Sequence, residues 1–164
     1  MVEAASLTQV EIFEGLNQDR LERIAATSHE EEYRRGEVIF RENTPGDSMY
    51  IVLDGEVEIQ VDPSILGEAP PQETEPASIT VIRRGQNFGE VALVDQGVRS
   101  ASAICRSRRV HLLVIPRQAF LQICEQDPTM GYQVMFNIAA DLSSRIRTTD
   151  FMLRGRLLLA PREQ

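Results

Sequence analysis

The stretch SMYIVLDGEVEIQV, residues 48–61, consists of two short runs of aliphatic and aromatic residues that meet at Gly55. Such runs are typical of β-strands, and a glycine between them allows positive φ and a tight reversal of the chain. Runs of the same kind recur between Tyr33 and Pro116. Further glycines that fall between such runs are Gly36, Gly46 and Gly85. The pattern predicts a β-roll or barrel of small antiparallel strands.

Helical patterns lie on both sides of this region. The spacing of Thr8 and Glu11 is that of a capping box and predicts a helix that starts near Thr8, and residues 17–28 repeat the apolar spacing of a second short helix. After Pro116 the helical spacing returns, and the last helix is expected to run to about Leu153. The expected fold class is therefore α+β, an antiparallel, jelly-roll-like barrel flanked by N-terminal and C-terminal helices.

The length of 164 residues and a hydrophobic content of 42% fit one domain with a single core. We expect that domain to span residues 1–153, followed by a tail over residues 154–164. Residues 62–78 are rich in proline, glutamate and small residues, which is typical of a flexible loop. The acidic run at residues 30–32 is expected to be solvated surface.

Charge and composition argue against several classes of function. The chain has 25 acidic and 17 basic residues and a formal charge of -8, which disfavours nucleic acid and anionic lipid as partners. Every basic residue is an arginine, so a Schiff-base or P-loop lysine is excluded. The residues after Met152 are too few for a helix-turn-helix reader of DNA.

No apolar run reaches the roughly 18 residues that a membrane span needs. The N-terminus has no signal-peptide pattern, and Cys105 and Cys124 show no paired spacing. We therefore expect a cytoplasmic protein whose two thiols are reduced and serve as packing residues.

Residues 87–103, NFGEVALVDQGVRSASA, contain the candidate binding site. Phe88 is expected to anchor the segment in the core, and Gly89 would let a ligand approach the backbone before a short helix whose first N–H groups favour an anion. A carboxylate at Glu90 would repel a bare phosphate unless it accepts hydrogen bonds from neutral hydroxyls. Arg99 follows past a turn and can return to bind phosphate. The alternative is purely structural, with Glu90 favouring the helix N-terminus or pairing with Arg99.

Together, residues 34–59, RRGEVIFRENTPGDSMYIVLDGEVEI, and residues 88–103 resemble cyclic nucleotide-binding domains of the catabolite-activator and kinase-regulatory type, here without a DNA-binding domain. The resemblance covers about Phe13 to Arg147. It departs from the family at ENTPGD, which replaces a commoner turn, at the long 62–78 loop, and before Val98, where no proline stands.

This resemblance implies that Glu90 accepts the ribose 2′-hydroxyl and that Arg99 neutralises the cyclic phosphate. Backbone groups from Gly89 to Ala92, together with Ser100, would complete the phosphate shell, and the small residues after Arg99 leave room for a flat base. The expected ligand-binding residues are Phe88, Gly89, Glu90, Val91, Ala92, Arg99, Ser100 and Ala101. The ligand is cAMP or cGMP, with cAMP favoured, although Ser100 does not decide between them.

Residues 87–103 are called the cassette below. Contacts to the base are expected from the last strand before the cassette and from the C-terminal helix. The candidates for the base contact and its lid are Val81, Ile82, Arg145, Phe151 and Met152. Movement of the C-terminal helices would then couple nucleotide binding to an unidentified protein effector or to a second subunit in a homodimer. No catalytic group, metal or cofactor is expected.

Two other functions would require sequence features of their own. A protein-interaction module of the same fold that binds no nucleotide would be expected to lack Glu90 or Arg99, and both are present. A cupin-like metalloenzyme would need clustered histidine and carboxylate ligands, whereas the only histidines are His29 and His111, far apart in the sequence.

Overall fold

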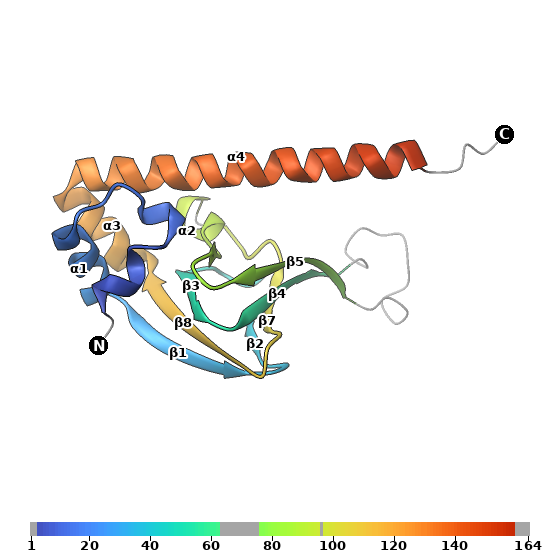
Figure 1. The fold of residues 1–164 in the computed structure, drawn as a ribbon, viewed down its shortest axis with the longest axis horizontal. Coiled ribbons are helices and arrows are strands. Elements are labelled where there is room, and N and C mark those ends of the chain that lie inside the picture. The colour runs from blue at the N-terminus through green and yellow to red at the C-terminus, as the bar shows by residue number, and fades with distance from the viewer. Residues whose placement is uncertain (1–2, 63–75, 96, 160–164) are drawn as a thin grey trace.

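Two four-stranded antiparallel sheets form a β-roll, with helices at one end and along one side (Figure 1). The structure is a computed structural model that describes residues 3–62, 76–95 and 97–159. The expected α+β fold is thus confirmed. The elements in chain order are η1 Ala4–Leu7, η2 Glu11–Phe13, α1 Gln18–Ala26, β1 His29–Arg34, β2 Val38–Phe40, β3 Ser48–Asp54, β4 Glu56–Val61, β5 Ala77–Arg83, β6 Asn87–Phe88, α2 Val91–Asp95, β7 Ser102–Cys105, β8 Arg109–Pro116, α3 Arg117–Gln126 and α4 Pro128–Leu159.

One sheet has the strand order β1-β8-β3-β6 and the other β2-β7-β4-β5. The predicted reversal at Gly55 is present, and the two strands that it joins, β3 and β4, belong to different sheets. In β3 and β8 both faces are buried, because one face packs on the helices and the other on the second sheet. This explains why LLVI, residues 112–115, is a continuous apolar run rather than an alternating one, since neither face of that part of β8 meets water.

The N-terminal helix prediction was wrong in its position. Thr8 ends the 3₁₀ turn η1 instead of starting a helix, and its hydroxyl donates to the carbonyl of Ala5 at 2.8 Å. The apolar residues of this segment are buried at intervals that no single helix face provides, so two short 3₁₀ turns place them in the core. These buried residues are Leu7, Val10, Ile12 and Phe13.

Two element boundaries also differ from the sequence expectation. The acidic run lies in β1, which begins at His29 and forms one edge of its sheet, where charged side chains oppose pairing with another strand. The loop predicted over residues 62–78 is shorter, because Ala77 and Ser78 pair with β4. The rest of that prediction, residues 63–75, lies outside the described residues.

The C-terminal helices begin where Pro116 and Asp127-Pro128 indicated. The last of them, α4, continues past Leu153 to Leu159, and the tail predicted from residue 154 is helical over its described part. A Cβ at Gly131 would lie 2.9 Å from the Cβ of Cys124, so the glycine permits close packing of α4 on α3. No helix within the described ranges has both the length and the apolar character to cross a membrane.

Candidate functional site

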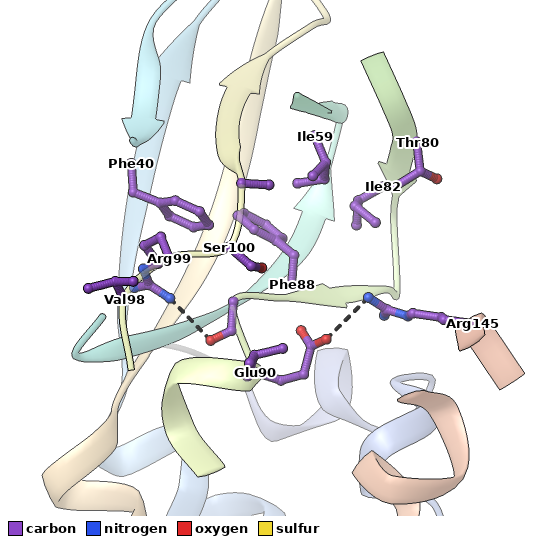
Figure 2. A pocket seen from close by; sticks show the side chains of 13 residues that line it. Phe40, Ile59, Thr80, Ile82, Phe88, Glu90, Val98, Arg99, Ser100 and Arg145 are labelled. Carbon is purple, nitrogen blue, oxygen red and sulfur yellow. Dashed lines mark hydrogen bonds and ion pairs between the residues drawn. The ribbon is translucent and has the colours of Figure 1, made fainter. Parts of the chain in front are cut away.

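A pocket opens between the second sheet and the middle of α4, and the residues of the 87–103 segment form its floor (Figure 2). It is lined mainly by apolar side chains, with two arginines and one carboxylate among them. The lining residues are Phe40, Ile59, Thr80, Ile82, Phe88, Gly89, Glu90, Val91, Val98, Arg99, Ser100, Ala101 and Arg145. The expected cassette residues whose side chains the structure describes therefore all line one pocket, and Ala92 belongs to α2, whose first residue, Val91, is among them.

Local geometry brings Glu90 and Arg99 to this pocket from opposite ends of the cassette. Phe88 is buried at the end of β6, Gly89 adopts a φ of 75°, and the chain then enters the short helix α2. A Cβ at Gly89 would lie only 2.6 Å from Nη1 of Arg99. Glycine is thus required here both for its backbone conformation and for the space that the guanidinium occupies.

The guanidinium of Arg99 is buried, with only 4% of the residue exposed. Its Nη1 donates to the carbonyl of Gly89 at 3.1 Å, while its Nε has no hydrogen-bond partner among the described residues. No carboxylate in that part of the chain forms an ion pair with it. Burial lowers the pKa of Arg99, although an arginine side chain stays protonated at neutral pH. The salt bridge between Glu90 and Arg99 that the structural alternative offered is absent between these two described residues.

Glu90 is buried as well and pairs with α4 instead. Its Oε1 lies 3.3 Å from Nη1 of Arg145, and its Oε2 has no partner among the described residues. Burial raises the pKa of Glu90, and the nearby Arg145 opposes this shift. Arg145 also donates to the carbonyl of Asn87 at 3.0 Å and pairs with Asp141 at 2.7 Å. A single side chain of α4 thus holds both the carboxylate and the backbone of the cassette.

The far end of the pocket, away from Arg99, is mainly apolar. Ile59 and Ile82 lie there on β4 and β5 with Thr80 beside them, whereas Ser100 lies next to Phe88 and Arg99 (Figure 2). Of the two predicted strand residues, Ile82 lines the pocket and Val81 does not, because successive side chains of a strand point to opposite faces.

Of the three α4 residues predicted as lid candidates, the structure brings only Arg145 to the pocket. Phe151 is 79% exposed and Met152 50% exposed, and neither lines it. The helix is straight (Figure 1), so Phe151 lies about 9 Å further along its axis than Arg145.

Four lining residues were missed by the sequence analysis: Phe40, Ile59, Thr80 and Val98. Ile59 and Thr80 could have been found from pairing, because they are direct partners in the β4–β5 register. Phe40 reaches the pocket because β2 pairs with β7, and Val98 because it directly precedes Arg99. No sequence pattern marks either residue.

No group of three potential metal ligands occurs among the described residues. His29 and His111 lie on neighbouring strands, yet each pairs with its own carboxylate, His29 with Glu31 and His111 with Glu30. The metalloenzyme hypothesis therefore has no cluster to support it in the described ranges.

Comparison with known proteins agrees with this geometry. Residues 30–127 match the model of the cyclic nucleotide-binding domain family. The chain belongs to this family. The cGMP-dependent protein kinase egl-4 of Caenorhabditis elegans is 35% identical over 114 residues. That match covers 70% of this chain but 14% of the kinase, so this family member spans only a small part of the length of that relative.

Solved structures share the fold. A cyclic nucleotide-binding domain from Methylobacillus flagellatus superposes with a TM-score of 0.75 at 22% identity, over 93% of this chain and 81% of that one. The catabolite activator protein of Thermus thermophilus gives a TM-score of 0.70 at 26% identity, over 88% of this chain and 62% of that one. The β-roll with flanking helices is thus the architecture of this family.

Proposed function

We propose that this domain binds a cyclic nucleotide in the pocket and transmits binding to α4. The observation that carries the proposal is the state of Arg99, which is a buried cation with no carboxylate partner among the described residues and a free Nε. Burying an unpaired charge is costly, so a buried guanidinium of this kind fits a site that receives an anion. The adjacent N-terminus of α2 adds N–H donors of the right polarity.

Two buried side-chain atoms of pocket-lining residues have no hydrogen-bond partner among the described residues, and each suits one part of the ligand. Nε of Arg99 would donate to the cyclic phosphate, and Oε2 of Glu90 would accept the ribose 2′-hydroxyl. Oε1 of Glu90 can remain with Arg145 in such a complex. A phosphate and a neutral hydroxyl next to each other are what distinguish a cyclic nucleotide from a simple anion.

For the base, we propose a preference for cAMP over cGMP. The far end of the pocket offers Ile59, Ile82 and the hydroxyl of Thr80, and Glu90, the one carboxylate among the described residues that line the pocket, is engaged at the ribose end. The guanine edge carries two N–H donor groups and a carbonyl, which lose more hydration than adenine does in an apolar site. The name of the egl-4 kinase specifies cGMP for that protein, which makes cGMP the necessary second ligand in the test.

Isothermal titration of ligand-stripped protein with cAMP and with cGMP tests the proposal. We expect micromolar or tighter binding of cAMP and weaker binding of cGMP. Tighter binding of cGMP would reverse the base preference alone. Binding of neither nucleotide would overturn the function and favour the alternative, a protein-interaction module of the same fold.

The coupling to α4 is proposed to run through Glu90 and Arg145. A ribose hydroxyl on Oε2 favours the ionised form of Glu90, and an ionised carboxylate holds Arg145 more strongly than a protonated one does. Nucleotide binding would therefore tighten the tie between the cassette and the helix. Two states of α4 with different contacts to the site are what such coupling requires.

Hydrogen exchange provides the measurement for this coupling. Addition of nucleotide is expected to slow amide exchange in residues 130–155, because α4 is held more firmly in the bound state. Arg145→Ala should remove most of this protection while Arg147→Ala, a neighbouring exposed arginine of the same helix, should leave it unchanged. Exchange in residues 130–155 that is identical with and without ligand would refute the coupling.

The effector, a homodimer and a cytoplasmic location stay predictions. Most of the exposed large apolar side chains of the described residues lie on α4, which makes this helix the surface where we expect a partner or a second copy to bind. They are Tyr132, Phe136, Ile146, Phe151 and Met152.

A further inference from the structure

The guanidinium of Arg99 lies against aromatic rings rather than against a carboxylate. Its Cζ is 4.2 Å from the ring centroid of Phe40 and 5.5 Å from that of Tyr50. Both distances are within the range in which a cation is attracted to the face of an aromatic ring. Phe40 stands on β2 and Tyr50 on β3, so residues from two different sheets meet at one arginine.

The rings themselves are packed into a fixed group. The centroids of Phe40 and Tyr50 are 5.6 Å apart, those of Phe40 and Phe88 5.8 Å, and those of Tyr50 and Phe88 5.1 Å. Tyr50 and Phe88 are buried in the core between the sheets, whereas Phe40 is half-buried and packs against that core. Of the three rings, Phe40 is therefore the one that contacts Arg99 at the partly exposed side, where both residues line the pocket.

The backbone of Arg99 is held separately from its side chain. Its N–H donates to the carbonyl of Thr44 at 2.8 Å, and its carbonyl accepts from the N–H of Asn43 at 2.8 Å. These two hydrogen bonds fix the position of Cα but leave the long side chain free to rotate. The guanidinium itself is oriented by one hydrogen bond to Gly89 and by the rings of Phe40 and Tyr50, of which Phe40 is the closer.

We propose that Phe40 is a positioning residue for Arg99: its ring holds the guanidinium against the β-roll, in place for an anion before a ligand arrives. This inference rests on the proposed function, because the anion to be bound is the cyclic phosphate. Orienting the side chain in advance reduces the conformational freedom that binding would otherwise have to remove. The ring face also partly offsets the burial of a cation that has no carboxylate partner among the described residues.

A double-mutant cycle separates this role from simple packing. Phe40→Leu is expected to weaken cyclic nucleotide binding by roughly 5- to 30-fold, the range of a desolvated cation–π contact. In an Arg99→Lys background, whose compact ammonium group has no planar face to stack, Phe40→Leu should cost less than about twofold. Phe40→Tyr, which keeps the ring, should bind like the parent.

Ile59→Ala is the matched control, because Ile59 lines the same pocket as Phe40 but makes no cation–π contact with Arg99. Its effect on affinity should be the same in both backgrounds. An equal loss for Phe40→Leu with Arg99 and with Lys at position 99 would overturn the positioning role, since the ring would then act independently of the guanidinium.

A ligand-independent readout keeps failure of this inference distinct from failure of the proposed function. The Nε–Hε signal of Arg99 in an NMR spectrum of ligand-free protein, assigned by its loss in Arg99→Lys, should be shifted upfield by the ring current of Phe40. Phe40→Leu should move it toward the signals of exposed arginines. An unshifted signal in the parent would overturn the positioning of Arg99, even if nucleotide binds. An upfield shift that disappears in Phe40→Leu would support the positioning, even if neither nucleotide binds.

Discussion

Arg99→Ala is expected to weaken binding of cyclic nucleotide by about 2–5 kcal/mol, the usual loss when a buried charge contact is truncated. The physical reason is that the variant removes the buried cation that the described residues place in the pocket, so the phosphate would lose both its counter-charge and a directed donor. Titration calorimetry against the parent measures the change. Arg147→Ala is the matched control, because Arg147 is exposed on α4 and does not line the pocket.

Replacing Arg99 by a neutral side chain of similar size should also change the stability of the ligand-free protein in an unusual direction. Removing a buried member of a salt bridge destabilises a fold, whereas the described residues provide no carboxylate partner for Arg99. We therefore expect the unfolding free energy of ligand-free Arg99→Met, which keeps much of the side-chain volume, to equal or exceed that of the parent. A variant that binds nucleotide as tightly as the parent would refute the site, and one that loses stability strongly would show that the arginine is structural.

Gly55→Ala is expected to lower the unfolding free energy by about 3 kcal/mol or more, the sum of a left-handed backbone and a steric clash. Gly55 has a φ of 88°, and a Cβ there would lie 2.4 Å from the carbonyl oxygen of Arg109 and 2.7 Å from Oγ of Ser107. The carbonyl belongs to the backbone of β8 and cannot move aside without disturbing that strand. Urea unfolding of the ligand-free protein measures the loss.

Gly36→Ala supplies the control for this prediction. Gly36 has nearly the same φ, 83°, but a Cβ there would meet nothing within 4 Å. Its substitution should cost only the conformational part, about 1–2 kcal/mol. If the two alanine variants were equally stable, the close approach of β8 to the Gly55 turn would not contribute, and the tight packing of that corner would be contradicted.

The strands and the cassette could be predicted from sequence because their determinants are local. A run such as SMYIVLD specifies a strand by its own composition. Gly89, Glu90 and Arg99 together provide a close backbone approach, a hydroxyl acceptor and a cation, a combination that few ligands other than a sugar phosphate require. The short helix after Gly89 was predicted for the same reason, from the order of residues within one segment.

The remaining contacts depend on distances between segments, which a single sequence does not contain. Whether Val81 or Ile82 faces the ligand is set by the register of β5 on β4, and a shift of one residue would exchange them. Of the lid candidates on the C-terminal helix, Phe151 and Met152 do not line the pocket because α4 continues as one straight helix past Arg145 (Figure 1). Phe40 was missed because its place beside Arg99 comes from the pairing of β2 with β7, not from its neighbours in the chain.

The uninterrupted course of α4 has a mechanical consequence. Near its start the helix is clamped by Gly131 against Cys124 and by the amide of Asn137, which donates to the carbonyls of Ile12 and Glu14. Beyond that clamp the helix extends to Leu159, roughly 30 Å at 1.5 Å per residue, with Arg145 between the fulcrum and the tip. A stiff rod of this kind acts as a lever: a tilt of about 5° at the clamp displaces its far end by roughly 3 Å. A change of a few tenths of an ångström at one carboxylate would thus reach a distant surface enlarged several-fold.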